Sequence, residues 1–491
     1  MNRRLALRLL VLACCIAGLA GCSNDTMEAP KLEFTNLLNI PPLLEPTIDQ
    51  EGRKHFTITM QSGATEFFEG VETPTWGVNG SYLGPTVRVS RGDRVSFEVI
   101  NRLDEASTLH WHGMRLPAAM DGGPHQMIEA GASWKPYWTI EQPAATTWYH
   151  PHLHEKTALH VYRGVAGLFL IEDEESRKLP SEYGVNDIPI VIQDKKFKSD
   201  GAFNENVTQA PFGILGNQIL INGTHDPHWK VASNRIRFRL LNGSNTRVYK
   251  IGFSDNRTFE LIANDAGLLP EPVSIDRLVV SPGERAEIVV EFEPGEETLL
   301  RSFPVKRDGI THSDFDLVKL IADRSLAPAP PLPRRLSAEP PIDAQHRETV
   351  RTFDFTTKSE INGKAMDMHR IDHVIPAGAR EIWVIRNRGW DHNFHIHDAV
   401  FTILDRNGSP PSAYERGRKD TVFIPSGTTV KIAVDFGRYA DPDTPYMYHC
   451  HLLYHEDSGM MGQFVIVEPG TENRVPRRLP DRGEAEHDHS S

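Results

Sequence analysis

The stretch IPAGAREIWVIRNRG, from Ile375 to Gly389, carries the pattern that decides the fold. After its glycine, apolar residues alternate with polar ones, which is typical of a strand with one buried face. The same pattern stands much earlier in VSRGDRVSFEVINRL, from Val89 to Leu103, and both copies place Gly nine residues before Asn-Arg. A third version, VASNRIRFRLLNGSN, carries Asn242 at the end of its alternating run. The repetition predicts three related units built from strands.

A second element also recurs three times, as EAGASWKPYWTI (129–140), SPGERAEIVVEF (281–292) and IPSGTTVKIAVDF (424–436). In each copy a turn around Gly leads into another alternating run. Three all-β units of roughly 130 to 150 residues predict three sandwiches in series. The expected division is a spacer at 23–45, domains at 46–178, 179–325 and 346–470, a Pro-rich linker at 326–345 and a charged tail at 471–491.

Composition sets broad limits on the function. The chain has 491 residues, of which 39% are hydrophobic and 24% charged, as in ordinary soluble globular proteins. Its 35 Pro and 37 Gly favour short strands and turns over long helices. The formal net charge of -13 argues against a nucleic acid partner.

The first 22 residues, MNRRLALRLLVLACCIAGLAGC, resemble a bacterial lipoprotein signal in which Cys22 becomes lipidated. A transmembrane anchor is the alternative, but the apolar run is short for a bilayer span. The expected location is therefore the bacterial cell envelope, with the membrane reached only through the lipid. Cys14 and Cys15 leave with the signal, so Cys450 remains as the one free thiol. A lone thiol in an exported protein favours metal binding.

Histidine pairs of the form His-X-His occur six times, at 110/112, 150/152, 152/154, 395/397, 449/451 and 487/489. With 22 His in the chain, about one such pair is expected by chance. Residues i and i+2 of a strand point to the same face, roughly 6.5 to 7 Å apart. Each pair therefore offers two neighbouring imidazoles to a metal.

The pairs align between the first and third units. WYHPHLH (148–154) corresponds to MYHCHLL (447–453), and HWHG (110–113) corresponds to HIHD (395–398). The middle unit has GSNTRVYKIGF at the matching place and supplies no pair. A metal cluster is thus predicted at the interface of units one and three, with the middle unit as a spacer.

The segment MYHCHLLYHEDSGMMG, from Met447 to Gly462, adds a second predicted site. On a strand, Cys450 faces away from His449 and His451. A thiolate with two His and a weak axial Met describes a blue-copper electron-transfer site, for which the candidates are Cys450, His455, Met460 and His392. An electron at the sulfur could pass through the backbone to either flanking His.

These motifs resemble the multicopper oxidases, most closely the three-domain bacterial copper efflux and laccase-like types. The family pattern HxHG, HxH, HxxHxH and HCHxxxHxxxxM reads here as HWHG, HPH, HNFHIH and HCHLLYHEDSGM. The resemblance implies three cupredoxin-like Greek-key β-sandwich domains and four copper ions. It assigns type 1 copper to His392, Cys450, His455 and Met460, and type 2 copper to His110 and His395. It assigns the type 3 pair to His112, His150, His152, His397, His449 and His451.

The resemblance also implies roles for two acids. Asp121 matches an acid near the type 2 copper, and Glu456 matches one near the type 3 pair. Oxygen reduction consumes protons, so an acid placed in such a site can donate them. The plain alternatives are an Asp-Gly turn for Asp121 and a surface charge for Glu456.

The implied activity is oxidation of a small donor coupled to reduction of dioxygen to water, in a monomer. Cuprous or other metal ions are the favoured donors, with a role in copper tolerance, and laccase-like oxidation of phenols is the alternative. A non-catalytic envelope protein, a copper store and a nitrite reductase stay open as other classes. Two interpretations stand for the segment with Met366, Asp367 and Met368. These residues could bind a cuprous ion, or the segment could be a strand edge with buried Met, which is the plainer expectation. Asp391 is considered as a contact for the donor at the rim of the type 1 site.

Overall fold

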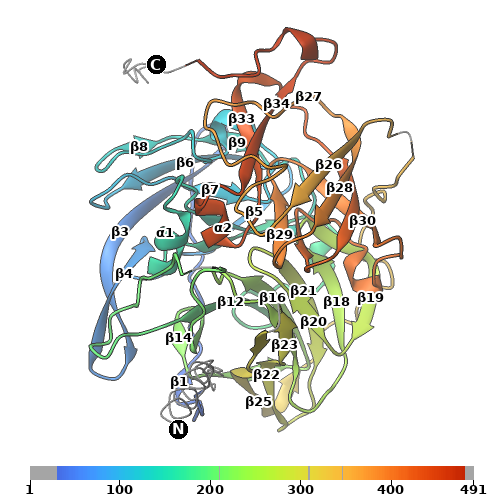
Figure 1. Cartoon of the computed structure of the whole chain (residues 1–491). Helices are drawn as coiled ribbons and strands as arrows, with labels where there is room; N and C mark the ends of the chain where they lie inside the picture. The colour runs from blue at the N-terminus through green and yellow to red at the C-terminus, as the bar shows by residue number, and fades with distance from the viewer. Residues whose placement is uncertain (1–29, 210, 308–309, 346, 481–491) are drawn as a thin grey trace, which may run out of the picture.

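The computed structural model describes residues 30–480 except 210, 308–309 and 346. Three β-sandwich units follow one another along the chain and are packed together, from blue through green to red in Figure 1. No helix within these residues is both long and apolar enough to cross a membrane. The predicted signal segment and its lipidation site, Cys22, lie outside the described residues.

The first unit packs two sheets over a core that includes Phe97, Trp111 and Phe169. One sheet contains β2 (Thr47–Ile48), β3 (Lys54–Phe68), β4 (Val71–Val78), β6 (Arg94–Asn101), β8 (Ser133–Trp134) and β9 (Tyr137–Thr139). The other contains β5 (Val87–Ser90), β7 (His110–His112), β10 (Ala145–His150) and β11 (Gly167–Glu172). Its helical turns are η1 (Ala118–Met120), α1 (Thr157–Arg163) and η2 (Ser176–Lys178). The predicted strand over 129–140 is split into β8 and β9, because Pro136 has no N–H to donate to a ladder.

The middle unit has a sheet of seven strands and one of six. The first comprises β12 (Asp187–Lys195), β13 (Gln218–Ile221), β14 (Thr224–His225), β16 (Arg235–Asn242), β18 (Phe259–Asn264), β19 (Gly267–Ile275) and β21 (Arg285–Glu291). The second comprises β1 (Asn36–Leu37), β15 (Pro227–Ser233), β17 (Tyr249–Phe253), β20 (Leu278–Val280), β22 (Glu297–Ser302) and β25 (Phe315–Ala327). A separate hairpin joins β23 (Val305–Arg307) to β24 (Ile310–His312).

The third unit has sheets of four and five strands. The first comprises β26 (Val350–Phe355), β28 (Arg380–Asn387), β30 (Val400–Arg406) and β32 (Thr429–Asp435). The second comprises β27 (His373–Pro376), β29 (His392–Ile396), β31 (Thr421–Ile424), β33 (Asp441–His449) and β34 (Met461–Val467). Its short helices are η3 (Ala413–Glu415), α2 (Leu453–Asp457) and η4 (Glu472–Arg474).

A buried asparagine repeats with the same bonds in all three units. The side-chain amides of Asn101, Asn242 and Asn387 each donate to two backbone carbonyls. Each side-chain oxygen accepts the N–H two residues further on. The recurring Asn of the sequence therefore closes the turn after β6, β16 and β28, which is where the three units are most alike.

Two segments expected to be peripheral enter the fold. The predicted spacer contributes β1, which pairs in parallel with β15, and Leu38 is buried in the core of the middle unit. In the predicted tail, Leu479 donates its N–H to the carbonyl of His369 at 2.7 Å. Both segments carry apolar side chains that pack against a sandwich, Leu38 in the middle unit and Leu479 in the third. Residues 481–491 lie outside the described part of the chain.

Candidate metal centre

The first unit brings two histidine pairs together on neighbouring strands. β7 and β10 are antiparallel, and their register places His112 opposite Trp148 and His110 opposite His150. His152 follows two residues beyond the end of β10. Alternation along β7 turns both of its imidazoles to one face, as the spacing predicts.

The third unit presents its pairs in the same way. β29 and β33 are antiparallel, and His395 stands opposite His449. His397 and His451 lie just beyond the ends of these strands. All ten predicted histidine ligands, from both units, are at most 3% exposed.

The eight cluster histidines converge in three groups across the interface of units one and three, and the ligand atoms of each group lie within 4.8 Å of one another. The groups are His110, His112 and His395; His112, His150 and His451; and His152, His397 and His449. The eight residues together are called the trinuclear group below.

In the third of these groups, bare nitrogens face one another. Nε2 of His449 lies 3.1 Å from Nε2 of His152 and 3.3 Å from Nε2 of His397. Nδ1 of His397 donates to Asp121 Oδ2 at 2.7 Å, while Nδ1 of His152 and of His449 lie 3.3 and 3.1 Å from the oxygens of Glu456. With protons on Nδ1, three lone pairs point at one place, which is favourable only around a metal ion.

The two predicted type 2 ligands are also oriented by a hydrogen bond from Nδ1. His110 donates from Nδ1 to the carbonyl of Asp121 at 2.9 Å, and His395 donates from Nδ1 to the carbonyl of Asp420 at 2.9 Å. Their Nε2 atoms are buried and have no hydrogen-bond partner. Such orphaned acceptors are costly without a ligand, so the site fits a metal.

Burial keeps these imidazoles neutral. Desolvation lowers the pKa of His152 and of His449 to about 3 and that of His395 to about 4. Desolvation also lowers the pKa of His112, His150, His397 and His451 well below the ordinary value. Neutral imidazole is the form that binds metal.

A second group stands on the other side of the His449–His451 segment. Cys450 Sγ lies 3.5 Å from Nδ1 of His392 and 3.6 Å from Nδ1 of His455, and these two nitrogens are 3.0 Å apart. Nε2 of His392 donates to Thr356 O at 3.0 Å and Nε2 of His455 to Pro211 O at 2.7 Å, so both Nδ1 atoms face the sulfur. Met460 is fully buried beside this group. One sulfur and two imidazoles suit copper.

The predicted strand through the Cys ends earlier than expected. β33 stops at His449, and Leu453–Asp457 form the short helix α2, which the sequence did not indicate. The sulfur nevertheless faces the opposite way from its two neighbours, as proposed from strand alternation. α2 carries His455 back toward Cys450 and places Glu456 against the trinuclear group.

Both predicted acids touch the trinuclear group. Asp121 contacts His397 through Oδ2 and His110 through its backbone carbonyl. Glu456 is 1% exposed and bridges His152 and His449, and burial raises its pKa. Glu456 is therefore no surface charge, and Asp121, which precedes Gly122 at a turn, is 1% exposed and contacts two of the imidazoles.

Two further expectations at the type 1 site were wrong. Asp391 is 3% exposed and accepts the N–H of Ser426 at 2.7 Å. It therefore stabilises a loop and does not line the surface where a donor would bind. The expected strand edge with buried Met is the second: Met366 and Met368 lie in a half-buried loop that belongs to no strand. The sequence-based predictions missed the supporting roles of Asn393, which stands between His392 and His395, and of Asp420; both are buried and hydrogen-bond to the ligands, which only the fold reveals.

Comparisons with known proteins agree with this geometry. Family models described as multicopper oxidase match residues 59–176 and 335–470. The chain is 36% identical to the multicopper oxidase mco of Staphylococcus aureus over 438 residues, 88% of this chain and 93% of that protein. It is equally 36% identical over 451 residues to the cell division protein FtsP of Salmonella typhimurium, which covers 87% of this chain and 92% of that one.

A solved structure is also close. The laccase-like multicopper oxidase CueO of Ochrobactrum sp., described with oxidase activity towards lignin model compounds and lignosulfonate, superimposes with a TM-score of 0.81 at 38% identity. That match covers 88% of this chain and 100% of the other. The chain belongs to the multicopper oxidase family, and its three units are cupredoxin-like sandwiches.

Proposed function

We propose that this protein oxidises a small electron donor at the Cys450 group and reduces dioxygen to water at the trinuclear group, with four copper ions bound. The observation that carries the proposal is the split at Cys450: its sulfur belongs to one ligand group and both neighbouring imidazoles belong to the other. Copper at these positions would supply one-electron transfer and dioxygen binding.

The residues of the chain supply protons and a dry site. Glu456 contacts Nδ1 of His152 and of His449, and Asp121 contacts Nδ1 of His397. A carboxyl group there can hold a proton close to the place where dioxygen is consumed. The ligands are almost completely shielded from solvent, which limits the escape of reactive intermediates.

Copper counting and oxygen uptake test the proposal. We expect about four coppers per copper-loaded chain, a blue thiolate band and dioxygen consumption that stops when the donor is exhausted. A protein that binds copper at the Cys450 group alone, or that consumes no dioxygen with any donor, would refute it.

For the donor we favour a metal ion, cuprous above all. Met366 donates its N–H to the carbonyl of Gly459, so the half-buried loop 366–368 lies next to Met460. This loop offers two thioethers and the Asp367 carboxylate, which is 37% exposed and pairs with Arg478. Such groups can bind a cation. Met366→Ala combined with Met368→Ala should slow oxidation of cuprous ion and leave phenol oxidation unchanged.

Phenols are the second candidate donor. Trp390 is 36% exposed, stands two residues before His392 and contacts Phe212 edge-on at 5.8 Å between ring centroids. An exposed indole at this place can stack on a phenolic ring. Trp390→Ala should then slow phenol oxidation alone. Turnover of a phenol that equals or exceeds that of cuprous ion would favour this reading.

A non-catalytic envelope role is suggested by the similarity to FtsP. The convergence of Cys450 and all ten predicted His ligands supports catalysis instead. A copper-loaded protein that complements a division defect but consumes no dioxygen would establish the non-catalytic role. We further propose a monomer exported to the envelope and anchored through Cys22; a labelled fatty acid should be incorporated into the wild-type chain and not into Cys22→Ala.

A further inference from the structure

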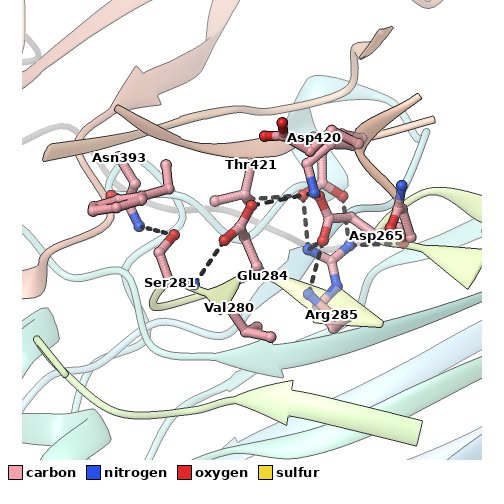
Figure 2. A network of polar contacts seen from close by, with 12 residues as sticks. Asp265, Val280, Ser281, Glu284, Arg285, Asn393, Asp420 and Thr421 are labelled. Atoms are coloured by element: carbon pink, nitrogen blue, oxygen red, sulfur yellow. Dashed lines mark hydrogen bonds and ion pairs between the residues drawn. The ribbon is translucent and has the colours of Figure 1, made fainter. Parts of the chain in front are cut away.

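The middle unit, expected to be a spacer, reaches the trinuclear group through one turn. This turn, Ser281–Arg285, joins β20 to β21 and is shown in Figure 2. A methyl group at Gly283 would lie 3.0 Å from the ring of His451, so the backbone of the turn lies against a trinuclear ligand. The unit without copper ligands is therefore in contact with the metal centre.

Arg285 is the central side chain of this contact and is 1% exposed. Nε donates to Thr146 O at 3.0 Å, which ties the guanidinium to the strand that ends at His150. Nη1 donates to Gly283 O and Nη2 to Asp265 O. The remaining two N–H groups form a fork on the carboxylate of Asp420, at 2.7 and 2.5 Å (Figure 2). All five donors are used, so the guanidinium has one orientation.

Asp420 passes this orientation on to two trinuclear ligands. Its Oδ1 lies 3.2 Å from Nε2 of His112 and accepts the Thr421 hydroxyl at 2.8 Å. Its backbone carbonyl accepts Nδ1–H of His395. Both carboxylate oxygens are held by Arg285, and the carboxylate therefore cannot turn away from the imidazole.

His112 needs this contact more than its neighbours do. Other rings of the trinuclear group donate Nδ1–H to a carbonyl or carboxylate oxygen. Their Nε2 is then left to bind the metal. His112 is reversed: Nε2 faces Asp420, and Nδ1 lies 3.3 Å from Nε2 of His150. The acceptor at Nε2 fixes which nitrogen is free to bind.

We infer that Arg285 is a positioning residue for the trinuclear copper site: it orients Asp420, which holds His112 with Nδ1 toward the metal. The inference rests on the proposed binding of copper. It gives the middle unit a part in the chemistry although it supplies no ligand. It also links units one, two and three through a single side chain, because Thr146, Arg285 and Asp420 each belong to a different unit.

Arg285→Gln tests the inference, with Arg239→Gln as the matched control. Arg239 is equally buried and bonds to the Thr146 hydroxyl, Asp187 and Glu287, but the structure shows no bond from it to Asp420. Both variants lose a buried ion pair and a bond to Thr146 of the first unit, and should lose similar thermal stability. Only Arg285→Gln should weaken retention of trinuclear copper against a chelator, by about 10- to 100-fold, and change the type 2 electron paramagnetic resonance signal. The blue band should keep its intensity in both.

The outcomes separate the inference from the proposed function. A wild-type protein that takes up no trinuclear copper would overturn both. Full copper retention and an unchanged resonance signal in Arg285→Gln, or equal copper loss in Arg239→Gln, would overturn the inference alone. If Arg285→Gln does not fold, Arg285→Lys is measured in the same way. A lysine keeps the charge but loses the fork, so it should fold, retain the blue band and shift the type 2 signal; an unchanged signal would refute the inference.

Discussion

The side-chain oxygen of Asn393 accepts the backbone N–H of His451 at 2.6 Å and lies 3.6 Å from Cys450 Sγ. The amide nitrogen of the same side chain donates to Pro282 O at 2.7 Å. One buried residue, placed between two ligands of β29, therefore touches the sulfur site, the trinuclear group and the turn of the middle unit. It fixes the backbone at the point where the chain passes from one metal site to the other.

Asn393→Ala should disturb the blue site more than the fold. The buried N–H of His451 and the carbonyl of Pro282 would lose their partners, at a cost of about 1 to 3 kcal/mol in the free energy of unfolding. The blue band should shift or weaken, because the segment that carries the sulfur is released. Asn101→Ala removes comparable bonds far from the sulfur in sequence and should match the stability loss without a spectral change. Equal spectra for the two variants would contradict the assignment.

Cys450→Ser should separate the two ligand groups. Serine is a poor copper ligand, so the blue band should vanish and turnover of the donor should stop. The trinuclear imidazoles lie on the other side of the segment and keep their acceptors, so their copper should remain largely bound. Copper analysis with absorption spectroscopy checks both halves. Loss of all copper from this variant would show that the groups do not assemble independently.

The convergence of the candidate ligands could be predicted from sequence because their spacing is tied to strand geometry. His110 and His112 share a face of β7, and His395 and His397 emerge from one strand end, so a period of two was informative. The recurring alternating run that ends on Asn101, Asn242 and Asn387 located the three sandwiches for the same reason. These features are local in the chain and independent of how the units dock.

The supporting residues could not be predicted because their roles depend on docking. Arg285 and Asp420 are 135 positions apart and come from different units. Lys419 and Asp420 are charged, yet both are buried and paired with residues of the middle unit. The helix α2 was hidden for another reason: Leu453–Asp457 is too short for a helical period to show.

The copper-free protein should lose stability as pH falls. Seven trinuclear imidazoles have pKa values lowered by burial, to about 3 for His152 and His449, against an ordinary 6.5. The unfolded chain therefore binds more protons below pH 6.5, and the free energy of unfolding should drop by up to about 1.4 kcal/mol per pH unit for each such group. The raised pKa values of four buried carboxyl groups, Asp265, Asp398, Glu456 and Asp457, act in the opposite direction but are fewer than the seven imidazoles.

Denaturant unfolding of chelator-treated protein at pH 7, 6 and 5 measures this slope. His152→Gln should flatten it, because one of the shifted groups is removed. His154→Gln is the control: this neighbouring imidazole is 26% exposed and pairs with Glu155 at the surface, so the slope should be unchanged. A stability that is constant from pH 7 to 5 would mean that these rings are protonated without cost in the folded state.

Asp121→Asn should slow oxygen reduction without removing copper. The asparagine oxygen can still accept Nδ1–H of His397, and the backbone carbonyl that serves His110 is unchanged. Only the ability to carry a proton is lost, which should cut the rate at which reduced protein is reoxidised by dioxygen by at least about 100-fold. Bleaching of the blue band by the donor should keep its rate. Stopped-flow measurement of the two half-reactions distinguishes this from a general loss of activity.

Gly113→Ala should damage the trinuclear group through the Arg285–Asp420 pair. Gly113 has φ +87°, and a methyl group there would lie 2.7 Å from Nη2 of Arg285 and 2.8 Å from Oδ2 of Asp420. Gly92→Ala is the matched control, because Gly92 has φ +93° but open space around its added carbon. Both variants should lose about 1 to 2 kcal/mol of stability from the left-handed backbone. Gly113→Ala should lose more than the control and also release trinuclear copper, because the fork on Asp420 must open to admit the methyl group. Equal stability and equal copper content in the two variants would show that the pair can shift without disturbing His112.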